Sequence, residues 1–282
     1  MKSLGIITDG TAQFSSTSFL GNEIIEIIPL GIEYKGELFL KNNENIIAKF
    51  PRVINKYNRP LVVLPSNKCL LRYIDTFLEK YDEIIFILTS KKIIGLYSSI
   101  KLLIKEHPKR NKMILIDSKT LSIGLGFIVQ RSAELFVNNQ YSRRELIQST
   151  RKLISNTYSL LCIPCHSYLA FLGKIDQAQY LTLEINNLLP LFIIDNGNLS
   201  PQEKVKTYRN CFLLFQEFID EFNNLDQIGF IKGIPNRTKE YKSLKKHCQN
   251  LFPSALFTSL FLNMIMAALF GPKTTSIFLM AK

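Results

Sequence analysis

Short apolar runs alternate with amphipathic stretches through the first half of the chain. The clearest case is the run Ile84–Leu88, which is followed by a polar loop, Thr89–Gly95, and then by a stretch in which Leu96, Ile100 and Leu103 share one helical face. Unbroken β-branched runs of this length are typical of strands buried on both faces of a parallel sheet. Loops after such strands build the ligand crevice of open α/β sheets. The pattern therefore predicts a site at Thr89–Gly95.

Four apolar runs of this kind end in polar turns, and helical patterns separate most of them. Alternating strands and helices favour a parallel sheet covered on both faces. We therefore expect one parallel sheet to contain Leu4–Thr8, Leu61–Leu64, Ile84–Leu88 and Met113–Ile116. Ser66 is expected to cap a helix over Lys68–Lys80, and Ser142 with Glu145 has capping-box spacing at the start of a helix over Tyr141–Asn156.

Other patterns of the first half are less regular. They predict an extended segment over Ile24–Tyr34, a turn at Lys35 and Gly36, a polar helix over Asn42–Asn58, and an apolar helix over Leu121–Val137. The last helix contains Gly124 and Gly126, which weaken a helix and are expected only where another segment packs closely.

The second half predicts strands and helices of mixed length. The expected strands are Ser159–Ile163, Leu188–Asp195 with its turn at Asn196 and Gly197, and Gln227–Gly233, and the expected helices are Ser167–Gly173, Glu203–Asn223 and Glu240–Leu251. The very apolar stretch Leu256–Phe270 approaches the length of a membrane span. Its Thr258, Ser259 and Asn263 favour a buried core helix or strand instead.

We therefore predict an α/β protein of two domains. Residues 1–157 form an N-terminal parallel sheet flanked by helices, and residues 158–282 form a C-terminal α/β domain. A chain of 282 residues with 46% hydrophobic residues has enough apolar surface for two such cores.

Charge and cysteine content narrow the class of protein. The formal net charge is +12, which favours an anionic contact such as an acidic partner or a transient membrane-surface contact. The basic residues are dispersed and lack interleaved aromatic residues, so no nucleic-acid binding is expected. The five cysteines do not form a disulfide framework, and the chain starts with no signal-peptide pattern. We expect a cytoplasmic protein.

Cys162-Ile163-Pro164-Cys165-His166 has the form of a c-type haem attachment motif. A redox or metal-binding dithiol is an alternative, but the segment continues an apolar strand, which favours two ordinary thiols at a strand end. We predict no metal and no cofactor.

Sequence motifs of common enzyme classes are absent, including the Walker loop and the Gly-x-Ser-x-Gly elbow. Asp9 and Asp117 both follow strands, and a carboxylate pair at one crevice would suit a hydrolase or phosphatase. We favour a structural role for both and predict that the chain is not an enzyme and has no catalytic residue.

An ordered set of short motifs resembles the DegV family over nearly the whole chain. The motifs are Ile7-Thr8-Asp9, Pro65-Ser66, Ser90 with Gly95 and Tyr97, Ile116-Asp117-Ser118 with Gly124 and Gly126, Tyr168-Leu169 with Gly173 and Ile175, and Pro190-Leu191 through Asp195-Asn196-Gly197 to Glu203-Lys204-Val205. The resemblance implies a two-domain carrier that holds one long-chain fatty acid and presents its carboxyl group to a separate fatty-acid kinase.

Several head-group motifs of the family are altered in this chain. Where the family has Thr-Ser-Gln, this sequence has Val62, Val63 and Leu64, and Ile94-Gly95-Leu96-Tyr97 replaces Ser-Gly-Thr-Tyr. Lys273-Thr274-Thr275-Ser276-Ile277 stands where a His-Thr-Gly-Pro-Gly segment is expected, and Lys206 and Lys174 replace two arginines. A carboxylate buried without donors costs several kcal/mol, so the family's head-group site cannot be used unchanged.

Two interpretations follow from these changes. In the first, Lys273 pairs with the acid, aided by Ser66, Ser90 and Thr274, and the wall around the acyl chain stays apolar. The expected lipid-binding residues are Ser66, Ser90, Ile94, Gly95, Leu96, Val62, Val63, Lys273 and Thr274. In the second, the chain is a diverged DegV-like interaction or structural protein that has lost fatty-acid binding. We take the first, a non-catalytic carrier of a fatty acid or similar lipid, as the leading hypothesis.

Overall fold

The computed structural model describes residues 3–139 and 142–282. Their contacts divide the chain into two compact units. The first unit comprises Met1–Gly31, Val63–Ser155 and Asn196–Asn198, and the second comprises Ile32–Val62, Asn156–Asp195 and Leu199–Lys282. A unit of dense contacts need not fold independently, so the division into domains at residues 157 and 158 stays a prediction.

The first unit contains a four-stranded parallel sheet that includes three of the four strands that the sequence predicts for it. Its strand order is β2-β1-β6-β7, with β1 at Leu4–Asp9, β2 at Ile25–Ile28, β6 at Glu83–Leu88 and β7 at Met113–Asp117. All six residues of β1 are buried, as are the last five of β6. The β-branched runs are therefore strands covered on both faces.

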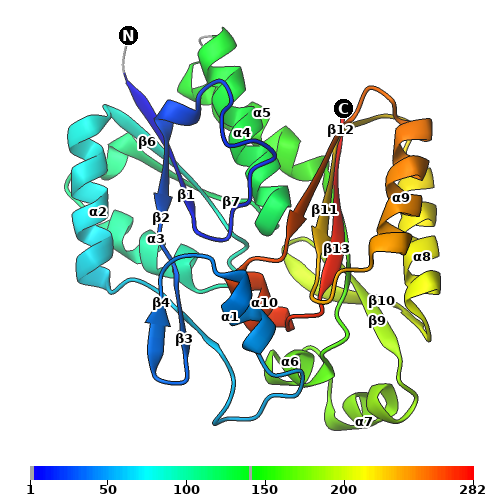
Figure 1. The fold of residues 1–282 in the computed structure, drawn as a ribbon. Coiled ribbons are helices and arrows are strands. Elements are labelled where there is room, and N and C mark those ends of the chain that lie inside the picture. The colour runs from blue at the N-terminus through cyan, green and yellow to red at the C-terminus, as the bar shows by residue number, and fades with distance from the viewer. Residues whose placement is uncertain (1–2, 140–141) are drawn as a thin grey trace. The chain divides into compact units, whose positions relative to one another are not determined.

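Helices cover both faces of this sheet (Figure 1). They are α2 (Asn67–Lys80), α3 (Leu96–Glu106), α4 (Ser122–Asn139) and α5 (Arg143–Ser155), with short 3-10 helices η1 (Asn22–Ile24) and η2 (Arg110–Lys112). Ser66 caps α2, and Ser142 and Glu145 form the expected capping box before α5. Tyr141, the predicted first residue of that helix, lies outside the described residues.

The prediction for Leu61–Leu64 is wrong. This segment forms β5 (Leu61–Val63), which belongs to a separate three-stranded sheet with β3 (Gly31–Tyr34) and β4 (Glu37–Phe39), in the order β4-β3-β5. The apolar stretch Ile24–Tyr34 likewise divides into β2 and β3. The reason is partial exposure: Leu61 is exposed and Val62 and Val63 are half-buried, unlike the strands of the parallel sheet.

The hairpin of β3 and β4 turns at Lys35 and Gly36 as predicted, with φ of 54° and 78°. The polar helix expected over Asn42–Asn58 is shorter, because α1 occupies only Glu44–Lys49 and ends before Pro51.

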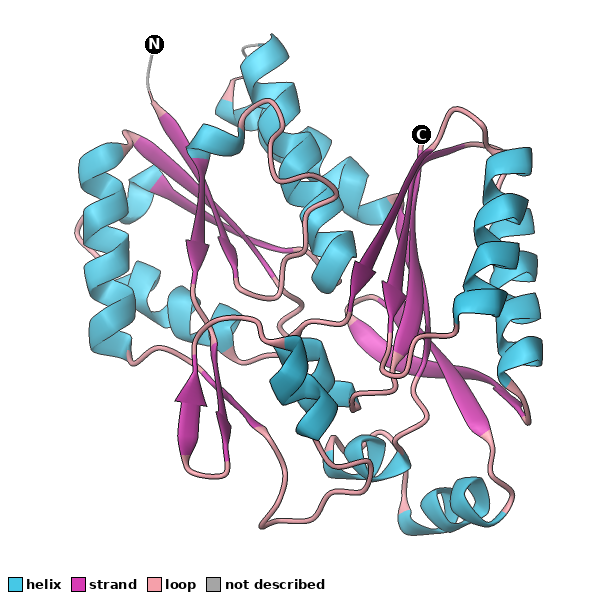
Figure 2. Ribbon diagram, in the orientation of Figure 1, coloured by secondary structure: helices cyan, strands magenta, loops and turns pink. Residues whose placement is uncertain are grey.

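The second unit is built on a six-stranded mixed sheet with the order β10-β9-β8-β13-β11-β12. The strands are β8 (Thr157–Cys162), β9 (Leu189–Asp195), β10 (Asn198–Val205), β11 (Leu225–Lys232), β12 (Leu256–Phe261) and β13 (Thr275–Ala281). Figure 2 shows two long helices, α8 (Tyr208–Asp220) and α9 (Thr238–Leu251), along one face of this sheet. Phe212, Phe215 and Phe230 pack in the core between these helices and the sheet.

Three expectations for this half need correction. The helix predicted over Glu203–Asn223 begins only at Tyr208, because Glu203–Val205 completes β10 and Thr207 caps the helix. Leu256–Phe270 is a strand followed by a helix, α10 (Met264–Phe270), since Asn263 Oδ1 accepts a hydrogen bond from Met266 N at 2.8 Å and starts a new element. The C-terminal segment Thr275–Ala281, for which the sequence predicts no strand, forms β13, a central strand of the sheet.

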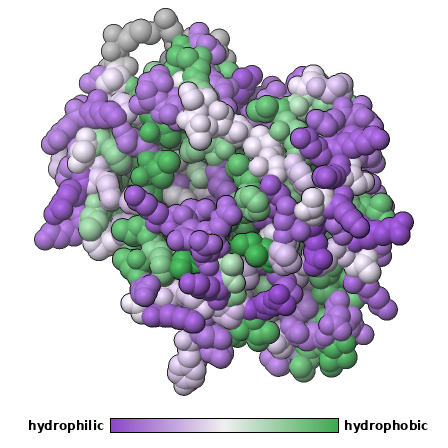
Figure 3. All heavy atoms as spheres, in the orientation of Figure 1, coloured by the Kyte–Doolittle hydropathy of each residue, from purple (hydrophilic) through white to green (hydrophobic). Residues whose placement is uncertain are grey.

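The short helices α6 (His166–Phe171) and α7 (Gln177–Ile185) complete the unit. No helix within residues 3–139 and 142–282 has the length and apolar character to cross a bilayer. On the face seen in Figure 3, hydrophilic and apolar residues are interspersed.

Candidate ligand-binding site

Asp9 anchors a buried polar network at the carboxyl ends of β1 and β6. Its Oδ1 accepts hydrogen bonds from Thr11 N at 3.0 Å, Thr11 Oγ1 at 2.7 Å and Thr89 Oγ1 at 2.9 Å, and its Oδ2 accepts one from Thr89 N at 2.7 Å. The two threonine hydroxyls also contact each other. Asp9 has no exposed surface, so these donors replace the water that a carboxylate needs. The network ties two loops together.

Asp117, at the end of β7, has a different environment. Its Oδ1 accepts hydrogen bonds from Lys119 N at 3.0 Å and Lys91 N at 3.4 Å, and Lys91 Nζ lies 3.8 Å from Oδ2. Each carboxylate thus has its own set of donors. A carboxylate pair for acid and base chemistry needs both groups at the substrate, and Asp9 is completely buried.

Ser90 lies in the loop where the sequence predicts a site, but its hydroxyl is already engaged. Ser90 Oγ donates to the carbonyl oxygen of Gly197 at 2.7 Å and accepts from Lys92 N at 3.3 Å. Gly197 has φ of 79°, and a Cβ there would lie 2.4 Å from Ser90 Oγ. The contact needs glycine in this turn for both reasons.

The remaining predicted residues of the first unit surround the same loop and the start of α2. Ile94 and Leu96 are buried at the start of α3, and exposed Gly95 has Leu64 Cδ1 3.8 Å from the position of a Cβ. Val63 is half-buried, and Ser66 is exposed and accepts a hydrogen bond from Cys69 N. These predicted residues are therefore mostly apolar, and Ser66 carries an exposed hydroxyl among them.

Lys273 and Thr274 lie in the second unit, in the turn between α10 and β13, and Val62 belongs to the same unit. Thr274 is buried, and its hydroxyl donates to the carbonyl oxygen of Phe270 at 2.8 Å. The backbone N–H of Lys273 donates to the Cys165 sulfur, and a Cβ at Gly233 would lie 2.6 Å from the Lys273 carbonyl oxygen. The backbone of Lys273 is thus fixed while its half-buried side chain remains at a crevice.

That crevice brings Lys273 together with Lys232 and Arg237, which the sequence analysis did not identify. Its volume is about 10 Å³, room for roughly one water, and its lining comprises Tyr208, Phe212, Phe230, Lys232, Gly233, Pro235, Asn236, Arg237, Lys273 and Thr275. No carboxylate is among these residues. The lining of the crevice therefore combines three cationic residues with aromatic rings.

Arg237 is held in place by Tyr208. Its guanidinium carbon lies 3.9 Å from the Tyr208 ring centroid, and the two side chains are hydrogen-bonded. Burial raises the pKa of Tyr208 to about 12, so its hydroxyl stays neutral. The sequence could have pointed to Arg237 as a site residue only through its position. Arg237 lies in the loop that follows strand β11, just as the predicted site lies in the loop that follows strand β6.

The Cys-x-x-Cys-His segment lies in the core of the second unit. Cys162 and Cys165 are buried, and His166 Nε2 donates to the carbonyl oxygen of Leu188 at 2.7 Å while Nδ1 lies 2.9 Å from Glu184 Oε1. A hydrogen bond with Cys211 and burial raise the pKa of Cys162, and burial raises that of Cys165. Thiols in this state are poor nucleophiles and poor metal ligands.

A thiol titration tests this arrangement. Among the five cysteines only Cys69 is exposed, so the native protein is expected to release about one equivalent of chromophore rapidly from an aromatic disulfide reagent near pH 8, and five after denaturation. Cys69→Ser should abolish the rapid phase. Two rapid equivalents in Cys69→Ser would instead identify Cys162 and Cys165 as an accessible pair.

The chain matches known proteins over nearly its whole length. Residues 3–282 match the family model described as "Uncharacterised protein, DegV family". The protein DegV of Bacillus subtilis is 23% identical over 235 residues, which are 83% of this chain and 80% of that protein.

Solved structures agree with the fold. The linoleic-acid-loaded fatty acid kinase B3 protein of Streptococcus pneumoniae superposes with a TM-score of 0.84 at 14% identity, covering 99% of this chain and all of that one. The fatty acid binding DegV family protein of Streptococcus agalactiae gives 0.82 at 16% identity, covering both chains completely. With a family model that spans 280 residues and the same fold throughout, the chain belongs to the DegV family.

Proposed function

We propose that this protein is a non-catalytic carrier that binds a long-chain fatty acid or similar lipid and holds its carboxylate at Lys273. The observation that carries the proposal is the crevice whose lining includes three cationic residues, Lys232, Arg237 and Lys273, and no carboxylate. Charge-assisted hydrogen bonds from ammonium and guanidinium groups are the strong bonds to a carboxylate. An acyl head group supplies the missing negative charge.

Two further observations support a lipid. The S. pneumoniae protein of this fold is loaded with linoleic acid, and the S. agalactiae protein is a fatty acid binding member of the family. The name of the S. pneumoniae protein also supports presentation of the bound acid to a fatty-acid kinase, with the carrier itself doing no chemistry. We place this role in the cytoplasm.

Two hydroxyl groups that were expected to bind the carboxylate are already hydrogen-bonded within the protein, so a cation is needed to bind it. The protons of Ser90 and Thr274 are donated to the carbonyl oxygens of Gly197 and Phe270, so neither hydroxyl can donate to a ligand without losing a bond inside the protein. Ser66 accepts a hydrogen bond from Cys69 N and keeps its own proton. Lys273 therefore carries more of the head-group interaction than a hydroxyl-rich site would require.

The crevice, at about 10 Å³, has room for roughly one water, so a ligand meets it from outside. A carboxylate pairs with Lys273 at its mouth, where the half-buried side chain keeps part of its hydration. Such a bond contributes about 1 to 3 kcal/mol.

Lys273→Met is expected to weaken binding of a fluorescent long-chain fatty acid about tenfold, since one decade of affinity corresponds to roughly 1.4 kcal/mol. Methionine keeps the chain length and removes the charge. The measurement is a fluorescence titration of delipidated protein, with the corresponding fatty alcohol as a second ligand. The alcohol should bind both proteins alike, because it has no carboxylate for Lys273 to pair with.

Lys242→Met is the matched control, since Lys242 is an exposed lysine on α9 of the same unit. It should bind the fatty acid as the parent does. Protein purified from bacteria should also carry an acyl chain by native mass spectrometry. A parent protein that neither carries nor binds a fatty acid would favour the diverged interaction protein instead.

A further inference from the structure

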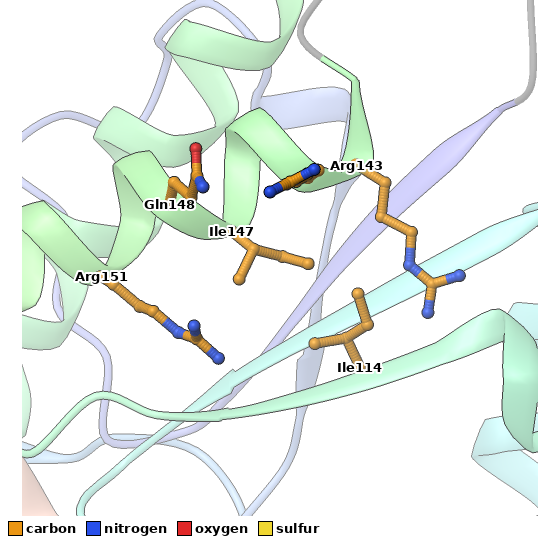
Figure 4. Close-up of a pocket in the computed structure, with 6 residues that line it drawn as sticks. Ile114, Arg143, Ile147, Gln148 and Arg151 are labelled. Carbon is orange, nitrogen blue, oxygen red and sulfur yellow. The ribbon is translucent and has the colours of Figure 1, made fainter.

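Helix α5 and the edge strand β7 border a second hollow, in the first unit, that is open to the surface and lies outside the proposed fatty-acid site. Its volume is about 640 Å³, and its lining residues are Ile114, Arg143, Arg144, Ile147, Gln148 and Arg151. In Figure 4, Ile147 and Ile114 point toward one another, and Arg143 and Arg151 flank them on either side. The hollow thus has an apolar floor between cationic walls.

The charges on α5 are unbalanced. The helix carries four basic side chains and one acidic side chain, Glu145. Glu145 Oε2 accepts hydrogen bonds from Ser142 N at 2.8 Å and Ser142 Oγ at 2.6 Å, and these bonds lower its pKa, so its charge stays at the helix start. Positive charge therefore dominates the rest of the helix.

The three arginines of the lining differ in their partners. Arg143 donates to the carbonyl oxygen of Asn111 at 2.9 Å and lies 3.6 Å from Glu83 Oε1. Arg144 and Arg151 are exposed, and no hydrogen bond or ion pair joins either of them to another residue of the described ranges. Two guanidinium groups are thus available to an external anion.

The spacing along α5 defines what fits. Arg144, Ile147, Gln148 and Arg151 follow one another at intervals of three, one and three residues, so they lie on one helical face. The two arginines are about 10 Å apart along the helix axis at 1.5 Å per residue. A second helix with carboxylates seven residues apart and an apolar residue between them presents the complementary pattern.

We propose that this hollow, the α5 hollow, binds an acidic amphipathic helix of a partner protein. Its arginines pair with two carboxylates seven residues apart, and its floor of Ile114 and Ile147 receives the apolar side chain between them. Arginine suits such a contact because its planar group binds carboxylates with two parallel hydrogen bonds. This inference does not depend on lipid binding.

The probe that tests it is a labelled helical peptide of about 20 residues, with two glutamates seven residues apart and leucines between them. A peptide of the same composition with shuffled order is the sequence control. Fluorescence anisotropy with the full chain should show saturable binding of the patterned peptide and at least tenfold weaker binding of the shuffled one. Equal binding of both peptides, or none, overturns the proposal.

The double variant Arg144→Glu with Arg151→Glu should bind the patterned peptide at least tenfold more weakly than the parent. The same variant should bind a charge-swapped peptide, in which lysines replace the two glutamates. This restored binding excludes simple unfolding as the cause. The matched control reverses two exposed lysines on α3, Lys101→Glu with Lys105→Glu, and should keep most of the affinity. Equal losses in the two double variants would show only net-charge attraction and would overturn the proposal.

Vesicles of phosphatidylglycerol form the last arm of the experiment. The proposal expects the parent and the α5 variant to co-sediment with them equally. A loss of vesicle binding confined to the Arg144 and Arg151 variant, together with unchanged peptide binding, would assign the surface to a membrane and reject the acidic helix.

Discussion

Asp9→Asn is expected to lower the free energy of unfolding by about 2 to 4 kcal/mol. The carboxylate accepts four hydrogen bonds, two from backbone N–H groups and two from the hydroxyls of Thr11 and Thr89. An asparagine offers one acceptor atom and places an NH2 group against donors that need an acceptor. Because Asp9 is completely buried, water cannot compensate the unpaired donors.

Urea unfolding followed by circular dichroism measures the change as a lower midpoint at an unaltered slope. Asp117→Asn is the matched control. Its side chain is 14% exposed, it accepts bonds from Lys119 N at 3.0 Å and Lys91 N at 3.4 Å, and water can reach it. A loss below about 1 kcal/mol is expected there. Similar losses at both positions would contradict the view that the Asp9 network holds the loops after β1 and β6.

The parallel sheet could be predicted because its strands are recognisable from local sequence. Leu4–Asp9 and Glu83–Leu88 are buried along nearly their whole length, so their composition departs strongly from that of the flanking turns. The Asn196-Gly197 turn was equally clear, since both residues have positive φ, 46° and 79°. In such segments the residues themselves specify the structure.

Other segments depend on pairing with distant residues. Leu61–Val63 is a short apolar run like those of the parallel sheet, and only its partners place it beside β3. Thr275–Ala281 becomes a central strand because β8 and β11, far away in the sequence, lie on either side of it. Local propensity contains no information on such neighbours.

The residues of the candidate site likewise fall into those that could be recognised from the sequence and those that only the packing of distant segments brings in. Lys273 could be selected because it replaces a family residue, whereas Lys232 and Arg237 lie some 36 to 41 residues earlier and join it only through the packing of β11 and β13. The engagement of Ser90 with Gly197, 107 residues apart, is equally invisible in sequence. The identities of polar residues were predictable, but the direction of their hydrogen bonds was not.

The glycines of α4 give the second large effect. The sequence predicts that a segment packs closely against this helix, and the structure confirms it for Gly126. A Cβ there would lie 2.0 Å from the carbonyl oxygen of Gln13 and 2.7 Å from its carbonyl carbon. Both atoms belong to the backbone, so no rotation of a flexible side chain can relieve the contact. The loop after β1 must move away from α4 to admit a methyl group.

Gly126→Ala is therefore expected to destabilise the protein by about 2 kcal/mol: overpacking costs up to roughly 3 kcal/mol, and the better helix propensity of alanine returns about 1 kcal/mol. Gly95→Ala is the matched control, since Gly95 has φ of −71° and its nearest neighbour would be Leu64 Cδ1 at an ordinary 3.8 Å. Its change should stay within about 0.5 kcal/mol. Urea midpoints of the two variants and the parent give both values. If Gly126→Ala is as stable as the parent, the loop that contains Gln13 can shift without cost. The close packing of this loop on α4 would then not require a glycine at position 126.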